Sequence, residues 1–198
     1  LEEIFCEYGL PYEIYGGHKF YDRKEIKDIL SYVKLISNEQ DNESFLRIIN
    51  TPTRGMGGQT ITALLSYAEK ENLPLYSALK QACEMKVSFL AGQKLSKALT
   101  FVELIEKLKR DDQKYVEASN LESGNISAIE YEDHIPLLLK NISEKAGYSA
   151  TLKKQGTPEA ESRLENINEL FAVAKEFSKR LLNNGEIPTL QLFLERTS

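Results

Sequence analysis

The chain has 198 residues, of which 41% are hydrophobic and 28% charged. This balance indicates one large or two small globular domains with a packed core, and it excludes a disordered chain. The formal net charge of −5 argues against a surface that binds nucleic acid over its whole extent, but it leaves a local basic face open.

The sequence has no apolar run of about 18 residues that could span a bilayer, and its N-terminus lacks the basic start and apolar stretch of a signal peptide. We therefore expect a cytoplasmic location and no membrane partner. Cys6 and Cys83 fit that compartment as ordinary buried thiols. Together with His18 and His134 they make no spacing that would hold zinc.

The N-terminal residues predict parts of elements rather than complete ones. Residues 1–9 have the pattern of the end of a helix closed by Gly9, with no capping residue before it. Residues 11–15 alternate as a short strand does and end at two glycines. Because a lone strand needs partners and few others are predicted, we expect the chain to be a fragment that begins inside an element.

Residues 22–37 predict a helix. Asp22 and Glu25 have the spacing of a capping box, and one apolar stripe should be buried. This stripe contains Ile26, Ile29, Leu30, Val33 and Ile36. The opposite face, with Lys24, Lys27, Asp28 and Lys34, should be solvated. Lys24 is expected to pair with Asp28 four residues on.

The remaining segments predict an all-α fold, an irregular helical domain with the one short strand near its N-terminus. Apolar spacing places Leu65 and Leu99 on inward stripes of their helices. Residues 111–133 are polar and predict a loop or linker, and residues 153–158 predict a basic turn. The expected helices cover residues 43–49, 59–71, 75–83, 89–115, 134–145 (entered through Pro136), 159–182 and 188–197.

Residues 50–60 separate two of these helices and contain a Gly-apolar-Gly turn. Gly55 and Gly57 tolerate backbone angles that other residues avoid, and they leave their N–H groups uncovered. Those groups precede a helix N-terminus, a geometry suited to a phosphate oxygen. We expect Met56 to anchor the turn in the core and Arg54 to be a mobile cation beside it. The alternative is a tight helix–helix connection in which glycine serves only the turn, and on the loop alone this alternative is favoured.

Motifs for catalysis are not found in this span. Residues 92–95 contain Gly92 and Lys94 but lack the preceding glycine and the hydroxyl of a phosphate-binding P-loop, and no dinucleotide fingerprint is present. His18 and His134 stand apart from any paired cysteine or carboxylate motif. We therefore expect no catalytic residue, no metal site and no cofactor site in this chain.

Three strings in order resemble the UvrD/PcrA/Rep-type superfamily 1 DNA helicases. PYEIYGGHKFYDRKEIKD (residues 11–28) matches a family pattern that begins Pro-Tyr-x-Ile-x-Gly-Gly. RIINTPTRGMG (47–57) matches Asn-Thr-Pro-x-Arg-Gly-Ile-Gly with Met56 in place of isoleucine, and RLENINEL (163–170) matches Arg-Leu-Glu-Asn-Leu-x-Glu-Leu. Together these strings cover nearly the whole chain, which makes them more specific than any single motif.

The resemblance implies the helical 2B subdomain of such a helicase. It implies that residues 1–17 are the edge of the 2A motor subdomain, 18–186 the 2B subdomain and 187–198 the re-entry into 2A. The parent would be an ATP-dependent 3′-to-5′ helicase, a hydrolase of DNA repair or replication, whose ATP and Mg²⁺ sites lie outside this span. Arg163 and Glu165 would then fasten 2B to its hinge or only decorate a helix surface.

The family's glycine loop contacts the backbone of duplex DNA ahead of a fork or junction. Carried over by position, the implied DNA-binding residues are Thr53, Arg54, Gly55, Met56, Gly57, Gly58 and Thr60. The implied partners are double-stranded DNA, the other helicase subdomains, and repair or transcription proteins. The alternative is a protein-interaction or autoinhibitory helical module without direct DNA contact, which the acidic balance favours slightly.

Overall fold

The computed structural model describes residues 18–119 and 128–197, and all regular elements in these ranges are helices. The all-α prediction is confirmed for these residues, whereas the predicted strand at 11–15 and the helix end at 1–9 lie outside them. The helices are α2 (His18–Tyr21), α3 (Lys24–Ser37), α4 (Asn42–Ile48), α5 (Gly58–Glu71), α6 (Leu75–Glu84), α7 (Gln93–Ser119), α8 (Ala128–Lys145), α9 (Tyr148–Gln155), α10 (Pro158–Asn183) and α11 (Leu190–Arg196).

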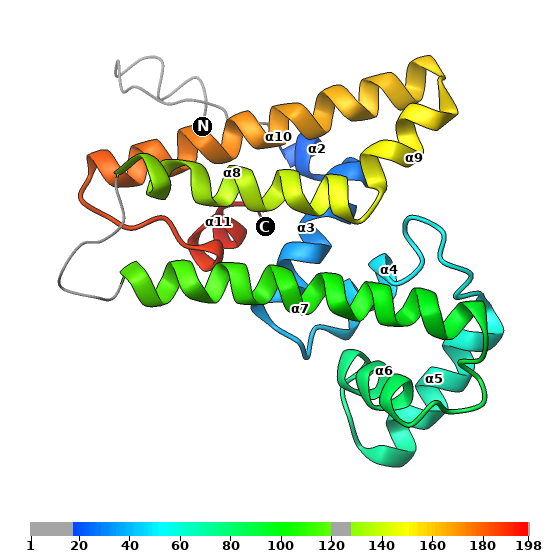
Figure 1. The fold of residues 1–198 in the computed structure, drawn as a ribbon. Helices are drawn as coiled ribbons and strands as arrows, with labels where there is room; N and C mark the ends of the chain where they lie inside the picture. The colour runs from blue at the N-terminus through cyan, green and yellow to red at the C-terminus, as the bar shows by residue number, and fades with distance from the viewer. Residues whose placement is uncertain (1–17, 120–127, 198) are drawn as a thin grey trace.

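Three long helices form the frame of the molecule. Helices α7, α8 and α10 run alternately in opposite directions, with α9 joining α8 to α10 (Figure 1). Helix α3 lies among them and packs against α4, α7, α8, α10 and α11. Helices α5 and α6 pack on each other beside the N-terminal end of α7 (Figure 1).

Helix α3 is the centre of the core, as its apolar stripe predicts. Every residue of that stripe is buried, and Tyr32 and Leu35 are fully buried as well. The predicted capping box is wrong: Arg23 is the N-cap in extended conformation, with no side-chain cap. Instead, Asp22 pairs with Lys27 at 2.7 Å. The buried carboxylate of Glu25 accepts a hydrogen bond of 2.6 Å from Asn166 Nδ2 on α10, so tertiary contact replaces the local cap.

Asp28, predicted to be solvated, is only 1% exposed and joins three helices. Its carboxylate accepts hydrogen bonds from Lys24 Nζ at 2.5 Å, Arg47 Nε at 2.8 Å and the Tyr148 hydroxyl at 2.7 Å. The predicted pairing of Lys24 with Asp28 is confirmed. Burial, together with the bond to this carboxylate, raises the pKa of Tyr148, so the phenol stays protonated as a donor.

Some predicted helix boundaries agree with the structure, and others differ from it for local reasons. Helix α5 ends at Asn72, in left-handed conformation with φ +52°, as predicted, and α4 begins after Asp41, whose side chain accepts from Ser44 N at 2.9 Å. Helix α7 begins at Gln93 rather than at residue 89, because Gly92 adopts φ +58°. The predicted basic turn at 153–158 is wrong, since Lys153 and Lys154 lie in α9 and only Gly156 turns the chain.

The predicted polar linker at 111–133 is largely helical. Helix α7 continues to Ser119, and α8 starts at Ala128 and carries Pro136 in its interior. The Tyr115 ring stacks on the His134 ring with centroids 3.5 Å apart, and His134 Nε2 lies 2.9 Å from Asp112 Oδ1. This packing between α7 and α8 keeps the segment helical in spite of its polar composition. Because the packing joins two helices, no local sequence pattern could have predicted it.

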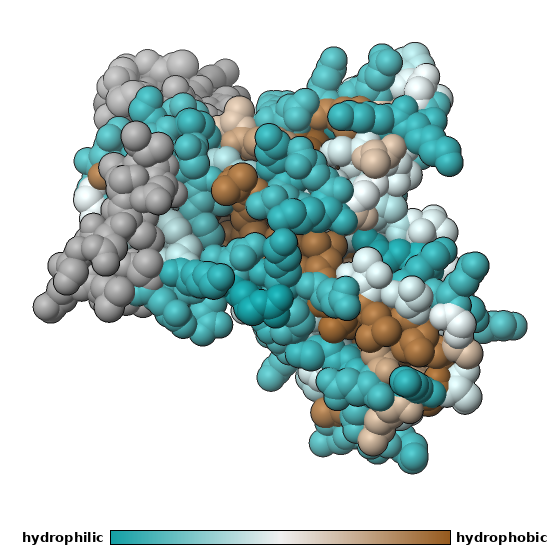
Figure 2. Space-filling model, in the orientation of Figure 1, coloured by the Kyte–Doolittle hydropathy of each residue, from teal (hydrophilic) through white to brown (hydrophobic). Residues whose placement is uncertain are grey.

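Apolar side chains also reach the surface near α5, α6 and the start of α7, where Figure 2 shows a hydrophobic area. Leu65 and Leu99, both predicted to be buried, are 43% and 39% exposed, and Met85 is 66% exposed. In the described ranges, no helix has the length and apolar content needed to cross a membrane.

The Asp28 network gives a stability prediction. Asp28→Ala should lower the free energy of unfolding by about 2–4 kcal/mol, because Arg47 and Tyr148 then lose their shared acceptor. The matched control is Asp22→Ala, which removes a surface ion pair and should cost under about 0.5 kcal/mol. Urea denaturation of both variants measures the difference. Equal small effects would show that the buried carboxylate does not stabilise the fold.

Candidate nucleic-acid interface

The segment between α4 and α5 is a loop at the edge of the molecule (Figure 1). Its Thr51–Pro52 peptide bond is cis, and Gly55 has φ +77°. The prediction of a left-handed glycine is therefore confirmed at Gly55. Gly57 differs, because it has an ordinary φ of −74° as the N-cap of α5.

The Asn50 side chain folds this loop back on itself. Its Oδ1 atom accepts hydrogen bonds from Arg54 N at 2.7 Å and Met56 N at 3.2 Å. Met56 is 2% exposed and belongs to the core, so its predicted role as anchor is confirmed. Asn50 is absent from the predicted site residues. Its position just after a helix, where Asn side chains bond to backbone two to several residues on, is the signal that could have identified it.

The Arg54 guanidinium points into the protein, so its prediction as a mobile cation is wrong. Nη1 donates to the carbonyl oxygens of Ile48 at 2.8 Å and Pro52 at 3.2 Å. Nη2 donates to the Tyr32 hydroxyl at 2.6 Å. The guanidinium carbon lies 5.0 Å from the centre of the Phe101 ring on α7. The carbonyls at the C-terminal end of α4 lack intrahelical donors, and a cation is favoured there.

Tyr32 completes this inner contact. Its hydroxyl accepts from Arg54 and donates to the Thr51 carbonyl oxygen at 2.9 Å. Burial raises the pKa of Tyr32 although the Arg54 charge opposes the shift, so the phenol remains a donor at neutral pH. Tyr32 lies on α3, far from the loop in sequence, and no local pattern could have indicated it.

The outer side of the loop is open backbone. Gly57 and Gly58 are exposed, and a Cβ atom built at either position would meet no heavy atom within 4 Å. No side chain caps the N-terminus of α5 in the described part of the chain; the first helical bond runs from Ile61 N to Gly57 O at 3.1 Å. The amides of Gly58, Gln59 and Thr60 therefore precede the first helical donor, at the positive end of a 14-residue helix. This arrangement can accept an anion.

The predicted site residues thus fall into two groups. Thr53, Gly55, Gly57 and Gly58 are exposed on the outer side of the loop. Met56 and Thr60 are buried, and the Arg54 side chain is half-buried and hydrogen-bonded inside. The outer group offers backbone donors, whereas the inner group holds the shape of the loop.

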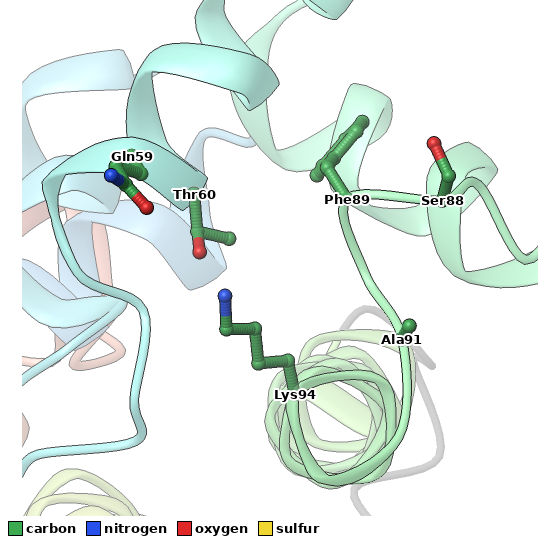
Figure 3. A pocket seen from close by; sticks show the side chains of 6 residues that line it. All are labelled: Gln59, Thr60, Ser88, Phe89, Ala91 and Lys94. Carbon is green, nitrogen blue, oxygen red and sulfur yellow. The ribbon is translucent and has the colours of Figure 1, made fainter.

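A pocket of about 320 Å³ adjoins the start of α5, and sequence reasoning did not predict it. It lies between the first residues of α5, the connection from α6 to α7, and the first turn of α7 (Figure 3). Its lining residues are Gln59, Thr60, Ser88, Phe89, Ala91 and Lys94. The sequence analysis considered Lys94 only as part of a P-loop motif, which is absent. Nothing in the sequence indicated that Lys94 lines a pocket with residues of α5.

The inner position of Arg54 gives a second prediction. Arg54→Lys should destabilise the protein by about 1–3 kcal/mol, because an ammonium on a flexible stem does not serve separated acceptors and Phe101 as a planar guanidinium does. Thr53→Ala, at the exposed neighbouring position, is the matched control and should change stability by less than about 0.5 kcal/mol. Thermal unfolding measures both. An Arg54→Lys protein as stable as the wild type would contradict the inner role.

Comparison with known proteins agrees with the resemblance seen in the sequence. The model of the UvrD-like helicase C-terminal domain matches residues 1–198. The chain is 36% identical over 179 residues to the ATP-dependent DNA helicase PcrA of Staphylococcus aureus, covering 90% of this chain and 22% of that protein. It is 38% identical over 194 residues to PcrA of Bacillus subtilis, covering 98% of this chain and 23% of that protein. The chain thus spans less than a quarter of the length of these relatives, and it belongs to the UvrD-like helicase C-terminal domain family.

Proposed function

We propose that this chain is the helical 2B subdomain of an ATP-dependent 3′-to-5′ DNA helicase and that it contacts the backbone of duplex DNA through the loop before α5. The family match and the PcrA relatives support the parent activity. The contact would hold and orient the duplex at a fork or junction without reading bases, because phosphate contacts carry no sequence information directly.

The observation that carries the proposal is the bare backbone at Gly57 and Gly58. Neither glycine is required by a positive φ, and neither has a neighbour that would exclude a side chain. The fold therefore supplies no internal reason for glycine at these two positions. Close approach of an external group to the backbone is such a reason, and the uncapped amides of α5 favour an anionic one.

The proposed contact is made by backbone amides and not by a charged side chain. Arg54 acts through the loop: its guanidinium fixes the inner side, and Met56 anchors the turn, so the amide donors are held in place before DNA arrives. Because amides carry no net charge, this contact displaces few counterions. Its loss should therefore lower duplex affinity with little change in the salt dependence.

The proposal also assigns the rest of the chain. Residues 18–186 would be the 2B subdomain, and residues 1–17 and 187–198 would connect it to the 2A motor subdomain. ATP and Mg²⁺ would bind outside this span. Rotation of 2B relative to the motor would change whether the loop meets the duplex, and so would regulate unwinding.

Gly57→Ala tests the loop contact. The added methyl group occupies open space in the free protein, so the free energy of unfolding should change by less than about 1 kcal/mol. The same methyl group would separate the amides from a phosphate, and duplex affinity should fall about tenfold. Fluorescence anisotropy with a labelled blunt-ended duplex, on the full-length protein, measures the affinity.

Ser66→Ala serves as control, since Ser66 is exposed on α5, lies outside the predicted site residues and leaves the α5 amides open. It should bind duplex within about twofold of the wild type. Wild-type affinity in Gly57→Ala, with the fold intact, would remove the loop from the DNA contact and favour a protein-interaction module.

A further inference from the structure

The chain contains two methionines, and the structure gives them opposite surroundings. Met56 anchors the loop before α5 and is 2% exposed, whereas Met85 is 66% exposed at the end of α6. A thioether in a protein is oxidised where an oxidant can reach its sulfur atom. Met85 is therefore the more reactive of the two, and Met56 serves as an internal reference.

The backbone around Met85 is fixed, so its side chain leaves the protein at a defined place. Met85 is the C-cap of α6, and its N–H donates to the Gln81 carbonyl oxygen at 2.9 Å. Lys86 follows in left-handed conformation with φ +50°, and Val87 N donates to the Ala82 carbonyl oxygen at 3.0 Å. These bonds close the helix. The Met85 side chain thus starts from a hydrogen-bonded helix end.

Tyr67 on α5 contacts the sulfur atom from one side. Its hydroxyl donates to Met85 Sδ, with 3.5 Å between oxygen and sulfur. The Tyr67 ring also packs on the Phe89 ring, with centroids 5.9 Å apart. This ring packing places the hydroxyl independently of the methionine. A thioether is only a weak acceptor, so a phenol held against an exposed sulfur is a feature that exposure alone does not explain.

The two lone pairs of the Met85 sulfur are made different by this contact. The Tyr67 hydroxyl occupies one lone pair, so an oxidant from solvent meets the other. Methionine sulfoxide is chiral at sulfur, and each lone pair leads to a different epimer. The hydrogen bond from Tyr67 therefore favours one epimer of the product.

We propose that Met85 is a reversible oxidation site and that Tyr67 directs its oxidation to one sulfoxide epimer. The oxidant is hydrogen peroxide. The free sulfur lone pair attacks one peroxide oxygen, so that an S–O bond forms and the O–O bond breaks. The proton on the attacked oxygen passes to the departing hydroxide, which leaves as water. Sulfur loses two electrons, and the peroxide gains them.

The product is polar, and it can be converted back. Helix α6 and its neighbours carry an exposed hydrophobic area (Figure 2), and Met85 ends this helix, so oxidation adds a strong dipole there. A methionine sulfoxide reductase reverses the step with two thiols, which become a disulfide while the oxygen leaves as water. Each class of these reductases accepts one epimer. Oxidation to a single epimer would let one class restore Met85.

The experiment follows oxidation at each methionine of the full-length protein. The native protein is treated with dilute hydrogen peroxide, and mass spectrometry of its peptides measures the gain of one oxygen. Met85 should react at least about tenfold faster than Met56. The two reductase classes are then applied separately, and the fraction that each restores gives the epimer ratio at Met85. One epimer should exceed the other about fivefold, as one net hydrogen bond implies.

Tyr67→Phe tests the directing hydroxyl. It keeps the ring on Phe89, so the fold should be unaffected. The epimer ratio at Met85 should fall to within about twofold of equality, because both lone pairs are then open. Tyr21→Phe is the matched control: it removes a phenolic hydroxyl from α2, which lies away from α5 and α6 (Figure 1), and it should keep the wild-type ratio.

Three results would overturn the proposal. Equal oxidation rates at Met56 and Met85 would remove the site. An even epimer ratio in the wild type would show that the Tyr67 contact does not direct the reaction. An uneven ratio that Tyr67→Phe leaves unchanged would show the same. The duplex contact is tested separately, since the oxidation is measured without DNA.

Discussion

The contact between the Arg54 guanidinium and the protein interior is the interaction on which the candidate interface depends. One side chain serves carbonyl oxygens at the end of α4, the Tyr32 hydroxyl on α3 and the Phe101 ring on α7. It also reaches the Ala146 carbonyl oxygen after α8 at 3.4 Å. The guanidinium thereby ties the loop to helices that are distant in sequence, and the loop is fixed from within.

Fixing the loop from within leaves its outer side free for a partner. Met56 and the Asn50 side chain occupy the inner side, so the chain passes Gly57 and Gly58 with its backbone uncovered. Helix α5 starts there without a side-chain cap in the described part of the chain. Preorganised donors lose little freedom on binding, which lowers the cost of a contact made mainly by neutral groups.

The sequence allowed much of the core and the position of the loop to be predicted, because both depend on local patterns. The stripe on α3, the left-handed Gly55 and the anchor Met56 follow from helical spacing and from the conformational range of glycine. The burial of Asp28 and the inward turn of Arg54 could not be predicted in this way. Each depends on partners far away in sequence, such as Tyr148 for Asp28 and Phe101 for Arg54. Lys94 and Thr60 line one pocket although they belong to different helices, and neither helix alone indicates the pocket.

The most direct measurement of the central claim is an NMR titration of the ¹⁵N-labelled protein with duplex DNA. It follows the backbone amides of Gly57, Gly58 and Thr60 and the Nε–H of Arg54. The account predicts that the three amide signals move with increasing duplex, while the Arg54 signal stays in place because its guanidinium remains bound inside. Unmoved amides, or an Arg54 signal that shifts as strongly as they do, would contradict it.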